Sequence, residues 1–451
     1  MTTPDPARVR DLIAAESAAL VAAHPRCAEL AAQGREHLTY GVPMSWMAKW
    51  PGPFPLSVAH AQGAHFTCAD GIDHVDLCLG DTGAMCGHAP AATLAAITAQ
   101  LPNGLTAMLP TPDAAAVAGL LADRFGVPRW QLTLTATDAN RHVLRYARHL
   151  TGRPKVVVMD YCYHGTVDEA FANLDEQGRT VARRGNIGAP VDPALTTIVV
   201  PYNDVDALAA ALATGEVAAV LMEPALTNIG IVLPDPGYLE AVRRLTRQAG
   251  TWWVVDETHT LCAGHGGCTR AWGLDPDVVV IGKTIGGGVP IGAFGMTEGL
   301  ARAVEERIEL EDIDVGGVGG TLAGNALSTA AARATLAQVL TPDAFDQMVT
   351  LCDRWADGVQ QVLETFGLDW HVTRLGARAE YAFSAQPPHD GAQAAAADDF
   401  ELQQYLHLQA LVRGVLLTPF HNMALMSPAT TAADVDAHTA AFEAAARALT
   451  A

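Results

Sequence analysis

Lys283 is a single amine presented among apolar residues and glycines. The segment reads Asp277-Val-Val-Val-Ile-Gly-Lys-Thr-Ile-Gly-Gly-Gly-Val-Pro-Ile-Gly-Ala-Phe-Gly295, so a hydrophobic strand leads to the lysine and glycines follow it. Bulky side chains would obstruct a ligand here, whereas glycines let it approach the backbone closely. A lysine in this setting suits imine formation with an aldehyde better than an ion pair.

Asp256 ends a second apolar segment, Thr251-Trp-Trp-Val-Val-Asp-Glu-Thr258. This pattern predicts a buried strand that delivers a carboxylate to its carboxyl end. A lysine able to form a Schiff base, together with a buried aspartate, is the pair of side chains that pyridoxal 5'-phosphate (PLP) requires. The two segments therefore indicate PLP as the cofactor.

The residues that follow Asp256 allow a different reading. His259, Cys262, His265 and Cys268 are regularly spaced, and all four are of types that bind zinc. The segment is rich in glycine, however, and no second ligand pair with CxxC spacing accompanies it. We therefore expect a loop that lines the active site and no metal ion.

Composition excludes several classes of partner. Half of the 451 residues are apolar and 17% are charged, which is typical of a packed globular protein. The formal net charge of -21 argues against nucleic acid and anionic membranes as partners. The N-terminal residues lack the apolar core of a signal peptide, and the eight cysteines form no CxxC pair. We expect a cytoplasmic protein of roughly two or three structural units.

Helix and strand patterns alternate through the middle of the chain. Short, nearly continuous apolar runs there predict a mostly parallel sheet covered on both faces. The predicted strands are Phe54–Val58, Ala64–Gly71, Trp130–Leu134, Lys155–Met159, Thr197–Val200, Val217–Met222, Trp252–Val255, Val278–Ile281, Trp370–Val372 and Ala379–Phe383. The predicted helices include Arg8–Ala23, Pro112–Phe125, Ala139–Leu150, Pro236–Gly250 and Pro342–Phe366, and we expect a loop over Ser384–Asp398.

These patterns predict an α/β fold. Residues 86–335 would form a large cofactor-binding domain. Residues 1–85 and 336–451 would pair as a smaller α+β domain built from both ends of the chain.

Motifs in a characteristic order extend the argument beyond Lys283 and Asp256. They are Gly83-Ala-Met-Cys-Gly-His88, Thr135-Ala-Thr-Asp-Ala-Asn140, Tyr163-His-Gly165, Asp256-Glu-Thr258, the Gly282–Gly292 segment and Gly320-Thr-Leu-Ala-Gly-Asn325. Nearly the whole chain resembles the class III (ω-type) aminotransferases, which are PLP enzymes of fold-type I. The resemblance is strongest to the branch that holds glutamate-1-semialdehyde aminomutase and β-amino-acid transaminases.

The resemblance implies a catalytic pair. Lys283 would hold PLP as an aldimine and then shuttle a proton between substrate and cofactor carbons. Asp256 would face the pyridine nitrogen and keep it protonated.

The resemblance also implies contacts to the cofactor phosphate. Thr135, Ala136 and Thr137 would bind it at the start of a helix, where the family usually has glycine in place of Ala136. Thr321 would reach the phosphate of a neighbouring subunit, which requires a homodimer or a larger assembly. Helix N-capping remains an alternative role for Thr135 and Thr321.

Further contacts to the cofactor ring follow from the same motifs. Tyr163 would stack on the ring, His164 belongs to the same motif, and Thr258 would lie against the opposite face. Glu223 would lie near the cofactor hydroxyl, or alternatively form an ion pair at a strand end.

Substrate contacts are less well defined. Arg378 is the candidate to bind a substrate carboxylate, because its planar fork matches one, but it could instead pair with Glu380 on the same strand face. Trp46, Met44 and His421 would line the substrate pocket or simply pack in the core.

The expected function is a PLP-dependent aminotransferase that moves an amino group from an amine or amino acid to a keto acid or aldehyde. An aminomutase, lyase or epimerase is the alternative, because the same cofactor chemistry serves all of them. A P-loop enzyme is disfavoured, since Asp277 replaces the glycine that this motif needs ahead of Gly282.

Overall fold

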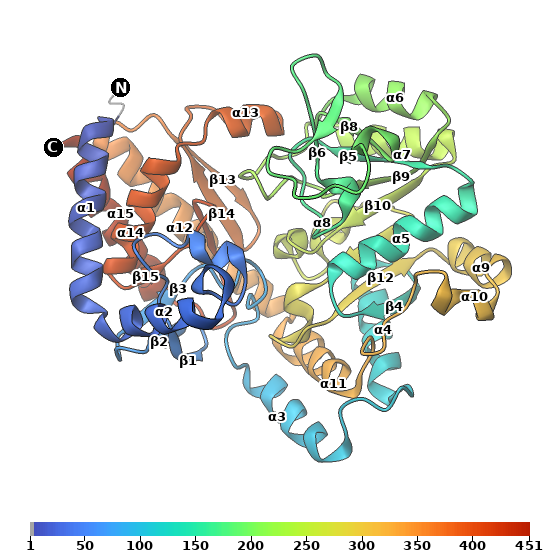
Figure 1. Cartoon of the computed structure of the whole chain (residues 1–451), viewed down its shortest axis with the longest axis horizontal. Coiled ribbons are helices and arrows are strands. Elements are labelled where there is room, and N and C mark those ends of the chain that lie inside the picture. Colours follow the sequence, from blue (N-terminus) through green and yellow to red (C-terminus); the bar gives the residue numbers. More distant parts are fainter. Residues whose placement is uncertain (1–3) are drawn as a thin grey trace. The chain divides into compact units, whose positions relative to one another are not determined.

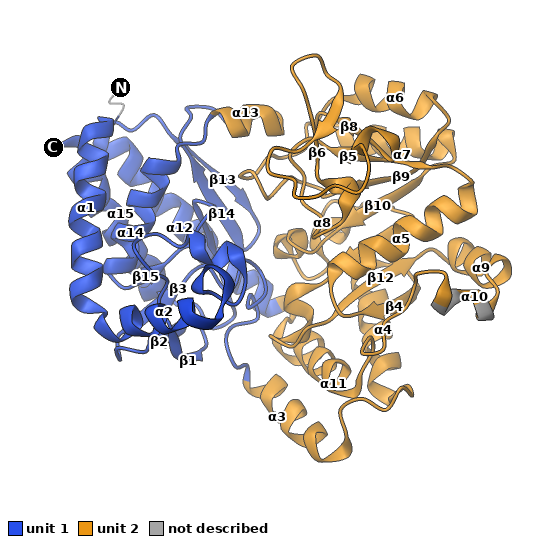
Figure 2. Ribbon diagram, in the orientation of Figure 1, with its two compact units in different colours: residues 1–90, 343–387, 397–451 blue, residues 91–342, 388–396 orange. Residues whose placement is uncertain are grey.

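The computed structural model describes residues 4–451, apart from the side chains of residues 311, 313 and 314. The chain forms two compact units (Figures 1 and 2). Unit 1 contains the chain up to Pro90 together with Asp343–Pro387 and Ala397–Ala451, and unit 2 contains Ala91–Pro342 and Pro388–Ala396. The sequence placed the divisions at residues 85 and 335, and it did not indicate that residues 388–396 belong with the central part. No helix within residues 4–451 is long and apolar enough to cross a membrane.

Unit 2 is built on a seven-stranded sheet in the order β4-β12-β11-β10-β9-β5-β8. The pairs formed among β8, β5, β9, β10 and β11 are parallel, and β12 runs antiparallel to β11 and β4. The strands are β4 Arg129–Thr133, β5 Lys155–Met159, β8 Thr197–Val200, β9 Val217–Met222, β10 Trp252–Asp256, β11 Val278–Ile281 and β12 Gly292–Met296.

Every residue of β9, β10 and β11 is buried. Because successive side chains point to opposite faces of a sheet, this pattern means that both faces are covered. Helix α5 packs on β12, β9 and β11, and α7 packs on β10. The α/β fold with a mostly parallel, helix-covered sheet is therefore confirmed.

Unit 2 also contains the following helices and a small antiparallel hairpin formed by β6 and β7. Their bounds are α3 Ala91–Gln100, α4 Pro112–Phe125, α5 Ala136–Thr151, α6 Val205–Ala213, α7 Tyr238–Ala249, α8 Gly267–Ala271, α9 Glu298–Arg307, α10 Leu310–Val315, α11 Ala326–Ala334, α13 Gly391–Ala396, β6 Ala172–Leu174 and β7 Thr180–Ala182.

Unit 1 combines helices with two small sheets, ordered β1-β2-β3-β15 and β13-β14-β16. Its helices are α1 Pro6–Ala23, α2 Pro25–His37, α12 Pro342–Phe366, α14 Phe400–Val412 and α15 Ala432–Thr450. Its strands are β1 Val58–Gln62, β2 His65–Cys68, β3 Asp73–Asp76, β13 His371–Leu375, β14 Arg378–Ala382, β15 Val415–Leu416 and β16 Met423–Leu425.

Two sequence predictions were wrong. Phe54–Val58 is not a strand: β1 begins only at Val58, because Pro53 and Pro55 supply no N–H for a ladder. The predicted loop Ser384–Asp398 contains helix α13, where an alanine-rich stretch favours helix.

Strand β12 was not predicted, because its glycines hide the strand pattern. Glycine is needed at positions 292 and 295 because neighbouring residues pack too closely there for a Cβ. A Cβ on Gly295 would lie 2.5 Å from Trp130, and one on Gly292 would lie 2.4 Å from the Thr135 backbone.

Candidate active site

Lys283 lies just beyond the carboxyl end of β11, where the strand gives way to a short 3-10 turn. Its φ of 52° is in the left-handed region, which side chains other than glycine rarely adopt. Such strain in a non-glycine residue often marks a functional position. Gly282, immediately before it, allows close packing, since a Cβ there would lie 3.0 Å from the Cβ of Ala136.

The amine of Lys283 contacts a buried chain of polar groups. Lys283 Nζ lies 2.5 Å from His259 Nε2. His259 Nδ1 lies 2.8 Å from the hydroxyl of Thr227, which in turn donates to a carboxylate oxygen of Glu223. Glu223 directly follows β9, and His259 lies in the loop after β10. The carboxyl ends of these parallel strands therefore bring the groups together.

Asp256, the last residue of β10, is buried and accepts hydrogen bonds on both carboxylate oxygens. His164 Nδ1 (3.0 Å) and Asn140 Nδ2 (2.9 Å) contact Oδ2, and the backbone N–H of Thr258 (3.0 Å) donates to Oδ1. Burial alone raises the pKa of the Asp256 carboxyl, but His164, Thr258 and Asn140 outweigh it and hold this pKa well below its usual value.

The imidazole of His164 responds in the opposite direction. Its burial disfavours the charged form, whereas Cys162 and the Asp256 carboxylate favour it, and the net effect raises the pKa of His164. Asp256 and His164 therefore form a buried ion pair. The carboxylate is a permanent negative charge at the strand end.

The N-terminus of α5 provides a place for an anion. Thr135 is its N-cap and accepts from the backbone N–H of Asp138 at 3.2 Å. Ala136 is the first helical residue and is not among the described residues with positive φ, so its Cβ is tolerated without backbone strain. Thr137 Oγ1 accepts from the backbone N–H of Thr166 at 3.2 Å. Free N–H groups and the helix dipole at this end favour a bound phosphate.

Tyr163 and Thr258 are the residues predicted to lie against the two faces of the cofactor ring. Tyr163 is half-buried beside His164, and Thr258 is buried next to Asp256. The roles of these side chains against a cofactor ring stay predictions.

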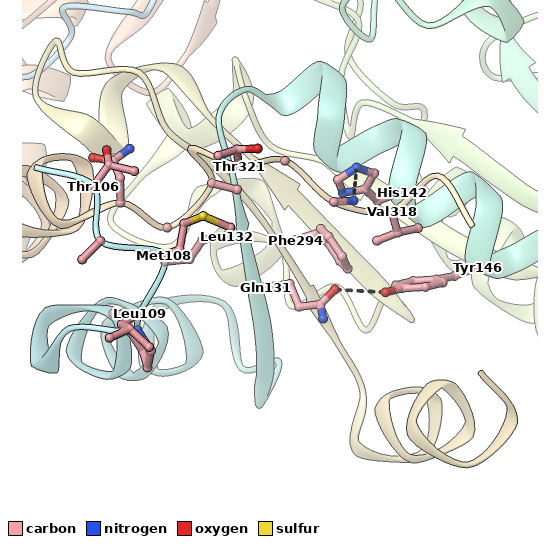
Figure 3. A pocket seen from close by; sticks show the side chains of 18 residues that line it. Thr106, Met108, Leu109, Gln131, Leu132, His142, Tyr146, Phe294, Val318 and Thr321 are labelled. Carbon is pink, nitrogen blue, oxygen red and sulfur yellow. Dashed lines mark hydrogen bonds between the residues drawn. The ribbon is translucent and has the colours of Figure 1, made fainter. Parts of the chain in front are cut away.

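Thr321 is exposed and belongs to a separate location in unit 2. It lines a pocket of about 590 Å³ together with Met108, Leu109, Leu132 and Phe294 (Figure 3). None of the residues that line this pocket belongs to the group around Lys283. A reach to a cofactor phosphate in a neighbouring subunit stays a prediction.

The predicted substrate residues all lie in unit 1. Arg378, on β14, is fully buried, and its guanidinium lies 3.6 Å from Glu380 and 3.8 Å from Asp81. His421 is also buried, with Nδ1 3.5 Å from Glu380. Burial raises the pKa of the Glu380 carboxyl, but His421 and Arg378 outweigh it, and the net shift is downward. This geometry favours the ion pair between Arg378 and Glu380, which was the alternative to a substrate role for Arg378.

Trp46 and Met44 are exposed side chains within unit 1. The Trp46 ring packs edge-on against Phe420, with 6.0 Å between the ring centroids. Their contact with a substrate remains a prediction.

The polar residues of the His259–Cys268 segment make contacts within the protein. His259 contacts Lys283, and the backbone N–H of Cys268 donates to Glu257 at 3.2 Å. In the part of the chain that the structure describes, the group able to bring three metal-ligand atoms within 4.8 Å is Cys27, Cys68 and Asp70. Both Asp70 oxygens already accept backbone N–H groups at the start of α2.

Sequence reasoning missed three members of this site. Asn140 appeared only within a motif, His259 only as part of a loop expected to line the active site, and Thr227 not at all. The available signal was position: His259 follows a buried parallel strand, and Asn140 lies among apolar residues on the inner face of α5.

Fold and site together define an α/β enzyme in which a strained lysine and a buried, permanently charged aspartate end neighbouring parallel strands. These groups fit PLP: the lysine can bind its aldehyde, the anion can face its ring nitrogen, and the start of α5 can take its phosphate. The family model described as Aminotransferase class-III matches residues 46–447. The chain belongs to this family of PLP-dependent enzymes.

Individual relatives agree. The chain is 33% identical over 400 residues to a glutamate-1-semialdehyde 2,1-aminomutase from Nitratidesulfovibrio vulgaris, covering 88% of this chain and 92% of the relative. It is similar to the crystal structure of a glutamate-1-semialdehyde-aminomutase from Pseudomonas aeruginosa, with 47% identity, a TM-score of 0.97 and coverage of 99% and 100% of the two chains. A variant of that enzyme has been solved in complex with PMP. An omega-transaminase from Sphaerobacter thermophilus is 28% identical, with a TM-score of 0.85 and coverage of 94% and 98%.

Proposed function

We propose that the protein is a PLP-dependent aminomutase that moves an amino group between neighbouring carbons of one small amino aldehyde. Glutamate-1-semialdehyde is the first substrate to test. The structural neighbour named as such an aminomutase supports this proposal, since it is 47% identical and spans 99% of the chain. Transfer between two different molecules, which was the expectation from the sequence, becomes the second candidate, and the 28% identical omega-transaminase supports it.

One observation carries the catalytic part of the proposal. Lys283 holds a left-handed backbone at the end of β11, and its neighbour strand β10 ends in the buried anion Asp256. When bound, PLP supplies an electron sink for the pair released when a C–H bond beside the amino group is broken. Lys283 would bind the aldehyde of PLP and carry a proton at Nζ, and Asp256 would keep the ring nitrogen protonated.

The remaining contacts would orient the cofactor. Thr135, Ala136 and Thr137 would hold the phosphate at the start of α5, as Thr137 already has a defined position against Thr166. His164 would keep Asp256 ionised and fixed in place. Tyr163 and Thr258 would take the two faces of the ring, and Glu223 the side of its hydroxyl.

An experiment with one substrate separates the two candidates. An aminomutase needs no second molecule, because the amino group leaves and re-enters the same carbon skeleton. Purified holoenzyme supplied with glutamate-1-semialdehyde alone should convert it to the isomeric amino ketone, which NMR distinguishes from the amino aldehyde by the loss of the aldehyde signal. The Lys283→Ala variant is the control and should be inactive. Turnover that requires both an amino donor and a keto acid would instead establish a transaminase.

We also propose that the active form is a homodimer or a larger assembly in which Thr321 completes the phosphate site of a neighbouring subunit. Met108 and Leu109 line the same pocket as Thr321 and are 79% and 73% exposed. Large apolar side chains gathered on a surface favour cover by a partner.

Subunit mixing tests this assembly. Lys283→Ala and Thr321→Arg subunits should each be inactive alone. In a mixed dimer, one site would receive an intact Lys283 and an intact Thr321, so mixing should restore part of the activity. Absence of recovery, with mixed dimers demonstrated by native mass spectrometry, would remove Thr321 from a shared site.

Arg378, Trp46, Met44 and His421 remain our proposed substrate contacts, with Arg378 as the group for a carboxylate. The ion pairs of Arg378 with Asp81 and Glu380 favour a structural role for it, so this part of the proposal needs a test of its own.

A further inference from the structure

The chain of contacts from Lys283 to Glu223 goes beyond the proposed use of PLP and rests on it. Its members lie at the ends of three strands that are adjacent in the sheet, β9, β10 and β11. Glu223, Thr227 and His259 are all buried, at 3%, 0% and 4% exposure. A buried imidazole that contacts the reacting amine is a candidate to exchange a proton with it.

The hydrogen bonds determine which ring nitrogen of His259 carries the proton. The single hydroxyl proton of Thr227 is donated to the Glu223 carboxylate, so the Thr227 oxygen accepts from His259 Nδ1. The neutral imidazole therefore has its proton on Nδ1 and its lone pair on Nε2. That lone pair faces Lys283 Nζ at 2.5 Å.

Electrostatics favour a proton on His259. The Glu223 carboxylate lies 3.8 Å from His259 Nδ1, and a nearby negative charge stabilises an imidazolium. Tyr202 and Cys268 also interact with Glu223, and burial raises the pKa of both, so they stay neutral. Asp256, on the same strand as the His259 loop, is already engaged by His164. Glu223 therefore supplies a negative charge close to His259.

We propose that His259 is a catalytic base for Lys283, with Thr227 and Glu223 as positioning residues. The proton of the Lys283 ammonium passes to His259 Nε2, which leaves a neutral amine and an imidazolium beside Glu223. When PLP is bound, the neutral amine of Lys283 would be free to attack its aldehyde, with one carbon–nitrogen bond formed and one water released. Neither electrons nor a further reactant are needed.

The test follows bond formation, separately from turnover. PLP is added to the full-length apoenzyme, and the visible absorbance of the imine is recorded by stopped flow across a pH series. His259→Gln keeps a hydrogen-bonding side chain that cannot take a proton. His265→Gln is the matched control, because His265 lies in the same loop and the charged groups that act on it are Arg124 and Arg270.

The wild type and His265→Gln should share one pH–rate profile. His259→Gln should be slower by about tenfold or more near neutral pH. Its rate should approach that of the wild type as the pH rises, because hydroxide then takes the proton that His259 would otherwise accept. A profile like the wild type's, or a deficit of equal size at every pH, would overturn the proposal.

A second variant covers the case in which His259→Gln does not fold. Thr227→Val preserves shape and cuts the link to Glu223, so it should show a smaller deficit in the same neutral pH range. An unchanged profile in Thr227→Val would also count against the relay. If the wild type itself forms no bond at Lys283, the proposed function fails instead, which mass spectrometry after borohydride reduction would reveal.

Discussion

Replacing Gly165 by alanine should weaken PLP binding through a displacement of Thr137. Gly165 has a φ of +73°, and a Cβ built on it would lie 2.0 Å from Thr137 Oγ1 and 3.0 Å from Thr137 Cβ. The 2.0 Å contact is impossible and the 3.0 Å contact is tight, so the Thr137 side chain must move away. The hydroxyl then leaves the position from which it accepts the Thr166 N–H and, in our proposal, binds the phosphate.

The size of the effect has two parts. A left-handed backbone costs an alanine roughly 1–2 kcal/mol relative to glycine, and this part lowers stability. Loss of a hydrogen bond to a charged phosphate costs about 1.5–3 kcal/mol. The second part appears in PLP affinity as about a 10- to 150-fold increase in Kd.

Gly178 supplies a matched control. Its φ is +71°, and a Cβ there would meet no atom within 4 Å. Gly178→Ala therefore carries the backbone cost without the collision. It should lose stability by a similar backbone amount and bind PLP like the wild type.

The assay is a PLP titration of each apoenzyme, with urea unfolding measured in parallel. Gly165→Ala should have the raised Kd, and Gly178→Ala should not. Equal PLP affinities in the two variants, with both folded, would refute the assignment of Thr137 to the phosphate.

Three further outcomes are expected. Asp256→Asn should slow single turnover by about 100-fold or more, near 3 kcal/mol in the barrier, because the ring nitrogen loses its anionic partner; a mild effect would remove Asp256 from that role. Lys283→Gly and Lys283→Ala should both be inactive. Urea unfolding should show that the glycine apoenzyme is more stable than the alanine apoenzyme by about 1 kcal/mol, since glycine accepts the left-handed backbone. Equal stabilities would argue against backbone strain at residue 283. Arg378→Met should lower unfolding stability by about 3–5 kcal/mol, because it removes a buried cation that faces the buried Glu380 carboxylate; unchanged stability with a raised KM for acidic substrates alone would assign Arg378 to substrate binding.

The buried strands could be predicted from the sequence because their apolar runs are bounded by turn residues. Val278–Ile281 and Val217–Met222 have the predicted bounds. Strand β12 could not be recognised in the same way. Its Gly292 and Gly295 are required by the close approach of Thr135 and Trp130, and these contacts are set by the folded sheet.

The candidate site shows the same division. Lys283 and Asp256 were recognisable because each polar residue ends an apolar run, and such residues meet at one edge of a parallel sheet. The link from His259 through Thr227 to Glu223 depends on the separation of loops that follow neighbouring strands. No spacing within one segment encodes that distance, so the sequence could place His259 in a loop that lines the active site but could not name its partners.

Alternation along a strand predicted one of the two carboxylates near Arg378 but not the other. Two-residue spacing places Arg378 and Glu380 on one face, and the structure has them 3.6 Å apart. The second carboxylate, Asp81, lies far away in the sequence and belongs to a different segment of unit 1. Its contribution to the burial of this charge became visible only in the folded chain.

The two histidine–carboxylate arrangements near the strand ends differ in what their protons can do. Asp256 contacts His164 directly, and the lowered pKa of one and raised pKa of the other keep both charged at neutral pH. The Asp256 contribution to stability is complete above its unfolded pKa of about 3.9 and is lost as pH falls through the lowered folded value. The His164 contribution is complete below about pH 6.5 and is lost only as pH rises through the raised folded pKa.

Glu223, by contrast, reaches His259 through the Thr227 hydroxyl, and His259 contacts an amine that must lose a proton to react. Because Asp256 is ionised throughout the neutral range, a neutral-pH defect in bond formation at Lys283 that is specific to His259→Gln would report on the His259 proton.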